Sequence, residues 1–533
     1  MKNLKIISTW SQGNKVGVIQ EIEDQIESKI ISFDWYFLVD FKNIDAVKKC
    51  LSGKYTGWFN SDPRSPDYVR VYVNDVYLKD HIKDKYGAVK ELESNGIKTY
   101  EGDLMNDRRW LLDHDFEISI DYKKLYIDIE TDDSLPKIEI GRDRILSFAA
   151  IDNEGKKYFQ MLESMTNKSE IALISYMIDI MTKYDVILGW NLKGFDVPYI
   201  KVRMKKLKIN RFQDWKHLAM IDLLLRFRHI FRFDSQIRKF NLDFVSKHFL
   251  GRGKISRTEK IIELFKKDKE KLEQYNLEDS ILVKELDDKL GVSKMMASQA
   301  AWCRVPVNQF GLYSIIDSFI LRIAHSIGRF GPTSLKAINE RRRFKEDKRT
   351  ENPDQTDTNK SKYTGAVVLN PIIGRYNRVY SFDFKSLYPS LIRTSNIGYD
   401  SIRNVADDDS IVNPGTNCIP RSNKIIKPTY FNKIPSVINL SVTKLLEKRK
   451  EYKNLKLKMI EDGTNYGSDW ERVVSDEIVV KELSNATYGI MGLSYGRYYS
   501  IDIAESITLF GQWAINYAKS YFESIGYQVI YGD

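Results

Sequence analysis

Acidic side chains at three places along the chain have the types and the spacing of a metal site. Residues 125–130 predict an apolar strand, and because alternate residues of a strand share a face, Asp128 and Glu130 project together. Two adjacent carboxylates repel unless a cation lies between them. A hard divalent ion, magnesium above all, suits such oxygen ligands. An isolated Asp-x-Glu pair is nevertheless more typical of a solvated strand end.

Two later segments add to this candidate site. Asp196 follows a predicted buried strand and a glycine turn, where a helix opens near Pro198. Tyr275 and Asp279 are four residues apart in a helical pattern and therefore share one helix face. Acids on separate elements suit two-metal phosphodiester hydrolysis, in which one metal lowers the pKa of an attacking water. Tyr275 could orient that water.

A second candidate site surrounds Asp383. Residues 379–383 alternate between apolar and polar and predict a strand that delivers Asp383 at its end. Ser386 and Pro389 predict a turn and the first turn of a helix, whose free backbone N–H groups can face an anion. A carboxylate beside such a phosphate cradle suits a metal–nucleotide site. The alternative is a buried strand with a capping aspartate.

Two predicted helices present basic side chains. In the helix at 436–460, Arg449 and Lys453 are four residues apart and share a face. In the next helix, Lys481, Asn485 and Tyr488 recur at helical spacing, so one face carries a cation, an amide and a ring. That face fits nucleotide phosphates and a stacking or groove-sensing ring. The alternative for most of these basic residues is simple solvation.

Bulk properties limit the class of protein. A chain of 533 residues is too long for one core, which predicts roughly three to five domains. Its net charge of +10 favours a polyanionic partner, although a solvated basic surface explains it equally well. Three separated cysteines without metal-ligand spacing indicate a reducing compartment. Since no apolar run has the length of a signal peptide or a membrane span, we expect a soluble, intracellular protein without a membrane partner.

The amino-acid sequences of these segments resemble sequence motifs of family B DNA polymerases. Residues 383–390, Asp-Phe-Lys-Ser-Leu-Tyr-Pro-Ser, are similar to motif A of that family, and residues 481–489 are similar to motif B. Residues 125–130, 186–200 and 275–279 resemble the exonuclease I, II and III motifs of DEDDy proofreading domains. The resemblance is strongest to replicative polymerases of large tailed myophages, which implies viral DNA replication in a host cytoplasm.

The resemblance implies an α/β (α+β) multidomain fold with a mainly β amino-terminal domain, a ribonuclease H-like 3′→5′ exonuclease domain, and a partial palm with helical fingers. The segments expected for this fold are an amino-terminal domain, an exonuclease, a helical linker with an exposed loop, two palm segments and the fingers between them. Their boundaries, in chain order, are 1–110, 111–292, 293–362, 363–435, 436–493 and 494–533.

The resemblance also implies roles at the exonuclease site. Two Mg²⁺ ions, or Mn²⁺, would be held there by four acids, with Tyr275 beside them. The four acids are Asp128, Glu130, Asp196 and Asp279. Between the second and third motifs, the basic residues of 251–254 could contact single-stranded DNA, or they could form a solvated loop.

At the polymerase site, the resemblance implies that Asp383 binds both metals with help from the Phe384 carbonyl. It places the Tyr388 ring under the deoxyribose and Tyr488 at the nascent base pair. The side chains and backbone expected at the triphosphate are those of Ser386, Leu387, Tyr388, Arg449, Lys453, Lys481 and Asn485.

The last predicted strand, residues 526–533, ends at Tyr-Gly-Asp. Motif C of the family continues Thr-Asp-Ser, so the resemblance implies that Asp533 adjusts the site while a following aspartate holds the metals. We therefore expect the amino-terminal part of a split or intein-interrupted polymerase. Its partners would be primer-template DNA, deoxynucleoside triphosphates, a carboxyl-terminal fragment carrying the rest of motif C and the thumb, and a sliding clamp through that fragment. A stand-alone 3′→5′ exonuclease and a non-catalytic DNA-binding scaffold are the alternatives.

Overall fold

A computed structural model gives the fold in two compact units. It describes residues 5–12, 14–22, 25–74, 76–77, 82–83, 85–211, 214, 218–231, 234–309, 311–339, 365–403, 405, 408, 410–412 and 429–533. Unit 1 comprises Met1–Ser32 and His114–Phe310, and unit 2 comprises Phe33–Asp113 and Gly311–Asp533. The amino-terminal domain expected at 1–110 is thus divided between the units. The loop expected at 341–362 lies outside the described residues, and the other boundaries stay predictions.

A five-stranded sheet forms the centre of unit 1. Its strands are β11 (Lys124–Thr131), β12 (Ile145–Asp152), β13 (Lys157–Met161), β14 (Val186–Gly189) and β15 (Ala219–Asp222). Their order is β13-β12-β11-β14-β15, with β11, β14 and β15 parallel and β12 antiparallel to both of its neighbours. This mixed sheet agrees with the predicted ribonuclease H-like fold.

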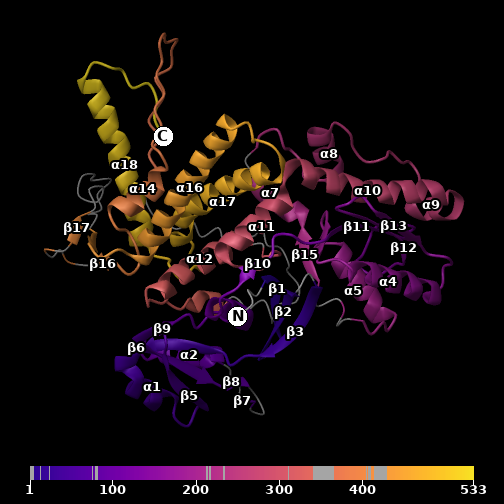
Figure 1. Cartoon of the computed structure of the whole chain (residues 1–533), viewed down its shortest axis with the longest axis horizontal. Helices are drawn as coiled ribbons and strands as arrows, with labels where there is room; N and C mark the ends of the chain where they lie inside the picture. The colour runs from indigo at the N-terminus through magenta and orange to yellow at the C-terminus, as the bar shows by residue number, and fades with distance from the viewer. Residues whose placement is uncertain are drawn as a thin grey trace. The chain divides into compact units, whose positions relative to one another are not determined.

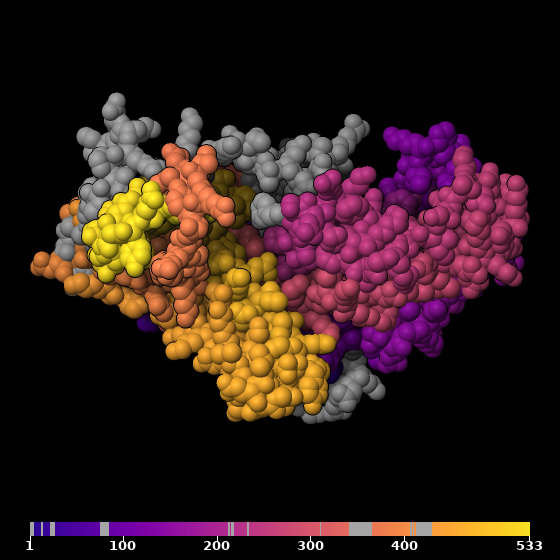
Figure 2. Space-filling model, turned by 90° about the horizontal axis from the view of Figure 1, so that it is seen from above, coloured from indigo at the N-terminus to yellow at the C-terminus, as the bar shows by residue number. Residues whose placement is uncertain are grey.

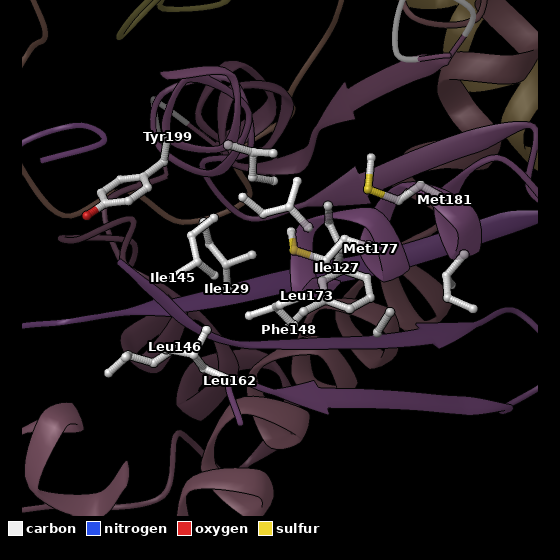
Figure 3. Close-up of a cluster of buried hydrophobic side chains, with 14 of the residues drawn as sticks. Ile127, Ile129, Ile145, Leu146, Phe148, Leu162, Leu173, Met177, Met181 and Tyr199 are labelled. Carbon is white, nitrogen blue, oxygen red and sulfur yellow. The ribbon is translucent and has the colours of Figure 1, made fainter. Parts of the chain in front are cut away.

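Helices cover both faces of this sheet (Figure 1). The helices described in unit 1 are α4 (Asn167–Met181), α5 (Asp196–Lys206), α7 (Leu223–Phe231), α8 (Leu242–Leu250), α9 (Ile261–Lys267), α10 (Lys269–Leu290) and α11 (Val292–Cys303), of which α8 packs on α10 and not on the sheet. Ile129 of β11 pairs with Phe148 of β12, and both pack with Leu173 and Met177 of α4 in the buried cluster of Figure 3. Because side chains alternate along β11, its even-numbered residues face the other side, towards α10.

A second sheet completes unit 1. It has the order β10-β1-β2-β3, in which the short β10 runs parallel to β1. Its strands are β1 (Lys5–Gln12), β2 (Lys15–Ile22), β3 (Gln25–Ser32) and β10 (Glu117–Ile118).

The first part of unit 2 is a sheet with the order β5-β6-β4-β9. Its strands are β4 (Tyr36–Asp40), β5 (Gly57–Asp62), β6 (Ser65–Val73) and β9 (Thr99–Tyr100). A short hairpin pairs β7 (Val76–Tyr77) with β8 (Ile82–Lys83). The helices here are the 3-10 helix η1 (Phe41–Asn43), α1 (Ile44–Leu51), α2 (Lys85–Ser94) and α3 (Asn106–Asp113). The strands of both units confirm the β-rich amino-terminal region.

The rest of unit 2 is mainly helical. Its helices are α12 (Leu312–Ser326), α14 (Leu387–Thr394), α16 (Val437–Glu461), α17 (Gly467–Met491) and α18 (Ile501–Ser524). A small sheet has the order β16 (Ile402–Arg403), β18 (Tyr430–Asn432), β17 (Ser410–Val412). Residues 462–466 join α16 to α17, and the two helices lie side by side (Figure 1). These are the two basic helices expected from the sequence.

A buried ion network ties the early and late parts of unit 2 together. Arg497, fully buried, contacts Asp103 at 2.9 Å and Asp317 at 2.7 Å. Arg108 adds a second cation, 2.9 Å from Asp317. A buried charge left without its partner costs several kcal/mol, so removing one of these side chains would destabilise the place where residues 33–113 meet α12 and the segment before α18.

Two strand predictions in unit 2 are wrong. Residues 379–383 and 526–533 have no strand hydrogen-bond pattern. A strand exists only with a partner, and the pairing observed at the carboxyl end is irregular: Leu369 N–H donates to the Gly532 carbonyl, and Ile372 N–H donates to the Ile530 carbonyl. An alternating pattern shows that a segment can pair, but it does not supply the neighbour.

No helix within the described parts of the chain combines the length and the apolarity that crossing a bilayer requires.

Candidate active sites

Three carboxylates meet on the α10 side of the five-stranded sheet. Asp128 and Glu130 come from β11 and Asp279 from α10, and one carboxylate oxygen of each lies within 4.8 Å of the others. Among the described residues this is the only group of three or more histidine, cysteine or acidic side chains with that geometry. The strand alternation and the helix spacing predicted from the sequence therefore bring these acids together.

Asp196 lies beside this cluster but outside its 4.8 Å limit. It is the first residue of α5 and is 3% exposed. Burial raises the pKa of its carboxyl, the nearby Glu130 adds to the rise, and the backbone N–H of Ile129 opposes it. Its Oδ1 atom is buried without a hydrogen-bond partner among the described residues.

The cluster is strongly biased towards binding protons or cations. Burial raises the pKa of Asp128 well above its usual value, and the charges of Asp279, Glu130 and Asp196 raise it further. Burial and Asp279 raise the pKa of Glu130 to about 8. The pKa of Asp279 is also raised, chiefly by burial, although Lys254 opposes the rise. Like charges crowded in a poorly solvated place favour any ligand that neutralises them.

Lys254 supplies one positive charge to this cluster. Its Nζ atom lies 2.6 Å from Asp279 Oδ2, and the side chain is 31% exposed. Burial lowers the pKa of this amine, but Asp279 and Asp128 raise it by more. The prediction that Lys254 contacts DNA or belongs to a solvated loop did not foresee this ion pair with a cluster acid.

The loop before Lys254 fits closely against α8. Lys254 N–H donates to Asp243 Oδ1, and a Cβ atom on Gly253 would come within 2.3 Å of the same oxygen. Glycine therefore permits the close approach that places Lys254 at the cluster.

Tyr275 packs between basic groups one helical turn before Asp279. The Lys254 Nζ lies 5.3 Å from the centre of its ring, and the Arg257 guanidinium lies 5.1 Å from it. Burial alone would lower the pKa of the Arg257 guanidinium, but a hydrogen bond with Tyr275 and nearby negative groups raise it overall. Cations over the ring and at the hydroxyl hold Tyr275 at the cluster edge, where the sequence predicts it.

Asn276 is a site residue that the sequence interpretation missed. Its Nδ2 donates to Asp128 Oδ2 at 2.6 Å, and its Oδ1 accepts from Ser147 Oγ at 2.8 Å. These bonds fix the carboxylate of Asp128 relative to α10. The available signal was its position three residues before Asp279 on one helix face.

The second candidate site begins where α14 begins. Ser386 has a left-handed backbone, with φ of 53°, and its Oγ accepts a hydrogen bond from Arg449 Nη1 at 2.8 Å. The turn predicted at Ser386 and the helix from Leu387 are both present. Arg449 of α16 thus lies at the amino end of α14. This is the arrangement needed if Arg449 and the backbone N–H groups of α14 are to bind the same phosphate group.

Two tyrosines meet beside this helix end. The ring of Tyr388 lies 4.6 Å from the ring of Tyr488 on α17, centre to centre, at 38°. A Cβ atom on Gly511 of α18 would come within 3.2 Å of Tyr388 Cε1, so glycine leaves the space that this ring occupies. The structure therefore joins two residues that the sequence placed in separate motifs.

The remaining predicted residues of this site are exposed. Lys453 lies on α16, while Lys481 and Asn485 lie on α17. Asp383 and Asp533 are also exposed, and neither belongs to a group of three or more candidate metal ligands within the described residues. Both aspartates lie in segments that form no regular strand. The metal-binding roles predicted for Asp383, Asp533 and the Phe384 carbonyl stay predictions.

Comparisons with known proteins identify the family. Residues 115–245 match the family "DNA polymerase family B, exonuclease domain", and residues 316–533 match "DNA polymerase family B". The first match covers β11 with Asp128 and Glu130, and α5 with Asp196, and the second covers residues 383–390 and 481–489. The chain belongs to DNA polymerase family B and carries that family's exonuclease domain.

Individual relatives agree with this assignment. The chain is 26% identical over 390 residues to DNA polymerase 1 of Aeropyrum pernix, covering 68% of this chain and 38% of that protein. It is 26% identical over 468 residues to DNA polymerase 1 of Sulfurisphaera ohwakuensis, covering 78% of this chain and 49% of that protein. The matched region thus spans less than half the length of these curated relatives.

A solved structure shows the same fold. The family B DNA polymerase from Pyrobaculum calidifontis aligns with a TM-score of 0.71 at 19% sequence identity, over 100% of this chain and 74% of that chain. The predicted multidomain α/β architecture, with its β-rich amino-terminal region, exonuclease and palm, is confirmed.

Proposed function

We propose that unit 1 is a 3′→5′ exonuclease that removes nucleotides from DNA ends with the help of divalent metal ions. The observation that carries this proposal is the cluster of Asp128, Glu130 and Asp279. Oxygen ligands at this spacing suit Mg²⁺ or Mn²⁺. The unpaired, buried Oδ1 atoms of Asp196 and Asp279 support the same conclusion, because each lacks the partner that a buried polar atom needs.

The position of each of the four acids determines its proposed role in metal binding. Asp128, Glu130 and Asp279 would hold a cation between the sheet and α10, and Asp196 would contribute from the start of α5. Bound divalent ions supply an activated water and stabilise the charge that develops on the phosphate. Asn276 keeps the Asp128 carboxylate oriented, and the Tyr275 hydroxyl orients the attacking water. Lys254, already beside Asp279, neutralises part of the negative charge near the scissile phosphate.

Unit 2 would contribute to nucleotidyl transfer in the same enzyme. In this proposal Asp383 binds the catalytic metals with the Phe384 carbonyl, and Tyr388 lies under the deoxyribose. The contact between Arg449 and Ser386 supports a triphosphate site at the amino end of α14, where backbone N–H groups face an anion. The exposed cation and amide of α17, Lys481 and Asn485, together with Lys453 of α16, complete that site.

A carboxyl-terminal polypeptide would complete the palm. Large apolar side chains are exposed around the unpaired segments: Phe382 is 74% exposed, and Tyr517 and Tyr527 are 62% and 57% exposed. Figure 2 shows the yellow carboxyl-terminal residues at the surface beside the orange segment after residue 365. Such a face suits strands that add to residues 526–533 and carry the metal-binding aspartate next to Asp533.

The resemblance found in the sequence adds a biological setting to this proposal. The enzyme replicates viral DNA in the cytoplasm of a bacterial host, takes primer-template DNA and deoxynucleoside triphosphates as substrates, and uses two Mg²⁺ ions at each site. The sliding clamp contacts the carboxyl-terminal fragment.

The test is degradation of a DNA strand labelled at its 5′ end. We expect the chain to shorten single-stranded DNA from the 3′ end with Mg²⁺ or Mn²⁺ and to be inactive with EDTA. We expect primer extension only when the carboxyl-terminal fragment is added. Metal-independent shortening would refute the exonuclease proposal, and equal extension without the fragment would refute the proposed completion of the palm.

A further inference from the structure

One buried acid lies among the cations of the two basic helices. Glu477 of α17 is 9% exposed. Its Oε1 lies 3.4 Å from Arg449 Nε, and its Oε2 lies 3.5 Å from Lys456 Nζ, both on α16. One carboxylate therefore spans two cations that are seven residues apart on the same face of the opposite helix.

This acid is connected to the proposed triphosphate site through Arg449. While Arg449 Nε faces Glu477, its Nη1 donates to Ser386 Oγ at the amino end of α14. Lys453 lies on the same stripe of α16, between Arg449 and Lys456, and is exposed. On α17, Glu477 is four residues before Lys481 and so shares its helix face.

We propose that Glu477 is a positioning residue of this site, an internal counter-anion that holds Arg449 and Lys456 in the nucleotide-free fingers and yields them to the incoming triphosphate. The inference rests on the proposed triphosphate site. In this inference Glu477 sets the affinity of the site for a polyphosphate. It also sets how strongly that affinity depends on the charge of the ligand.

The electrostatic argument gives the direction of the effect. Without an anion between them, Arg449 and Lys456 would repel each other, and Glu477 relieves that repulsion while Arg449 keeps its hydrogen bond to Ser386. When a triphosphate binds, the same carboxylate opposes it, because a partly buried negative charge is poorly screened. Only a ligand with several negative charges, such as a triphosphate, outcompetes it.

The experiment measures binding of dTTP, and of inorganic triphosphate as a base-free probe, to the full chain by calorimetry in the presence of Ca²⁺. Glu477→Gln keeps the shape and an acceptor for Arg449 but removes the charge. We expect it to bind both probes about two- to fivefold more tightly, a change of the size that a single solvent-accessible ion pair contributes. Its affinity should also fall more steeply with NaCl, since one more uncompensated cation meets the ligand.

Matched variants separate this role from a structural one. Lys456→Gln should weaken binding by a similar factor, because Glu477 then competes for Arg449 alone. The double variant should return to within about twofold of the wild type, since it removes one charge of each sign. Glu451→Gln, an exposed acid of α16 paired with Lys448, should change neither the affinity nor its salt dependence. Glu477→Asp, which keeps the charge, should bind like the wild type.

The outcomes distinguish this inference from the proposal beneath it. If wild-type binding is weakened by Lys481→Ala but Glu477→Gln binds no more tightly, the role of Glu477 is wrong and the triphosphate site stands. If the wild type binds neither probe, or if Lys481→Ala leaves binding unchanged, the triphosphate site itself is wrong. Weaker binding by both the Gln and Asp variants would show a structural role and overturn the inference.

Discussion

Changing Glu130 to glutamine should make the metal-free protein more stable at alkaline pH, although it removes a proposed metal ligand. Glu130 shares its surroundings with Asp128 and Asp279 at oxygen distances within 4.8 Å. With an effective dielectric constant of about 20, two carboxylates at that distance repel by about 3.5 kcal/mol. The rise in the pKa of Glu130 from 4.5 to about 8 corresponds to about 5 kcal/mol. Both routes give a penalty of about 3 to 5 kcal/mol, and the figure from the pKa already includes the opposing charge of Lys254.

The direction of the pH dependence follows from the raised pKa. Below about pH 4.5 Glu130 is neutral in both the folded and the unfolded chain, so it costs nothing. Between pH 4.5 and about 8 the unfolded chain releases this proton while the folded chain retains it, and the folded state loses stability as the pH rises. Above about pH 8 the loss is complete. A bound divalent cation removes the penalty, so the loss should be confined to the metal-free protein.

Calorimetric melting in EDTA at pH 5.5 and pH 8.5 would measure this effect. Since 1 kcal/mol shifts the melting temperature of a unit of this size by about 2–4 °C, we expect the wild-type transition assigned to unit 1 to fall by at least about 5 °C. The fall should be much smaller in Glu130→Gln, and Mg²⁺ should reverse it in the wild type. Glu154→Gln, an exposed acid in the turn between β12 and β13, is the control and should melt like the wild type. An equal fall in the wild type and in Glu130→Gln would refute the reasoning.

Three further predictions concern activity. Changing both Asp128 and Glu130 to alanine should lower metal-dependent 3′-end degradation by several orders of magnitude, and undiminished cleavage would remove these acids from the mechanism. In an enzyme reconstituted with the proposed carboxyl-terminal fragment, Tyr388→Ala should relax discrimination against ribonucleotides, whereas an unchanged ratio of deoxyribonucleotide to ribonucleotide insertion would argue against a steric role. Lys481→Ala should weaken the binding of all four deoxynucleotides alike, because a cation that contacts phosphate carries no base information; a base-dependent loss would contradict that contact.

Local periodicity predicted the parts of the exonuclease site that depend on one element at a time. Asp128 and Glu130 share a strand face, and Tyr275 and Asp279 share a helix face, because those relations are fixed by backbone geometry. That these two pairs would meet came from resemblance to a family, since periodicity says nothing about which helix covers which strand. In the structure, α10 packs on the sheet and so brings Asp279 to Asp128 and Glu130.

Periodicity did not predict Lys254 and Asn276, the two residues that complete the exonuclease site. Lys254 lies in a loop directly after Gly253, where no periodic pattern predicts the direction of a side chain, and its place at Asp279 depends on the close approach of Gly253 to Asp243. Asn276 was within reach of helix spacing, but an amide beside an acid is common on solvated helices. Its role becomes visible only from its contacts with Asp128 and Ser147.

The two sites differ most in how their acids are held. In unit 1 each cluster acid belongs to a paired strand or a packed helix, and Asn276 and Lys254 fix two of the carboxylates. In unit 2 Asp383 and Asp533 are exposed and lie in segments that form no regular strand, with only the irregular hydrogen bonds from Leu369 and Ile372 near the carboxyl end, so no regular ladder of hydrogen bonds fixes their separation. Two-metal transfer needs its carboxylates at a separation set to within fractions of an ångström. Additional strands against residues 379–383 and 526–533 would supply that constraint, and exonuclease activity should therefore be less sensitive than polymerisation to the presence of the proposed carboxyl-terminal fragment.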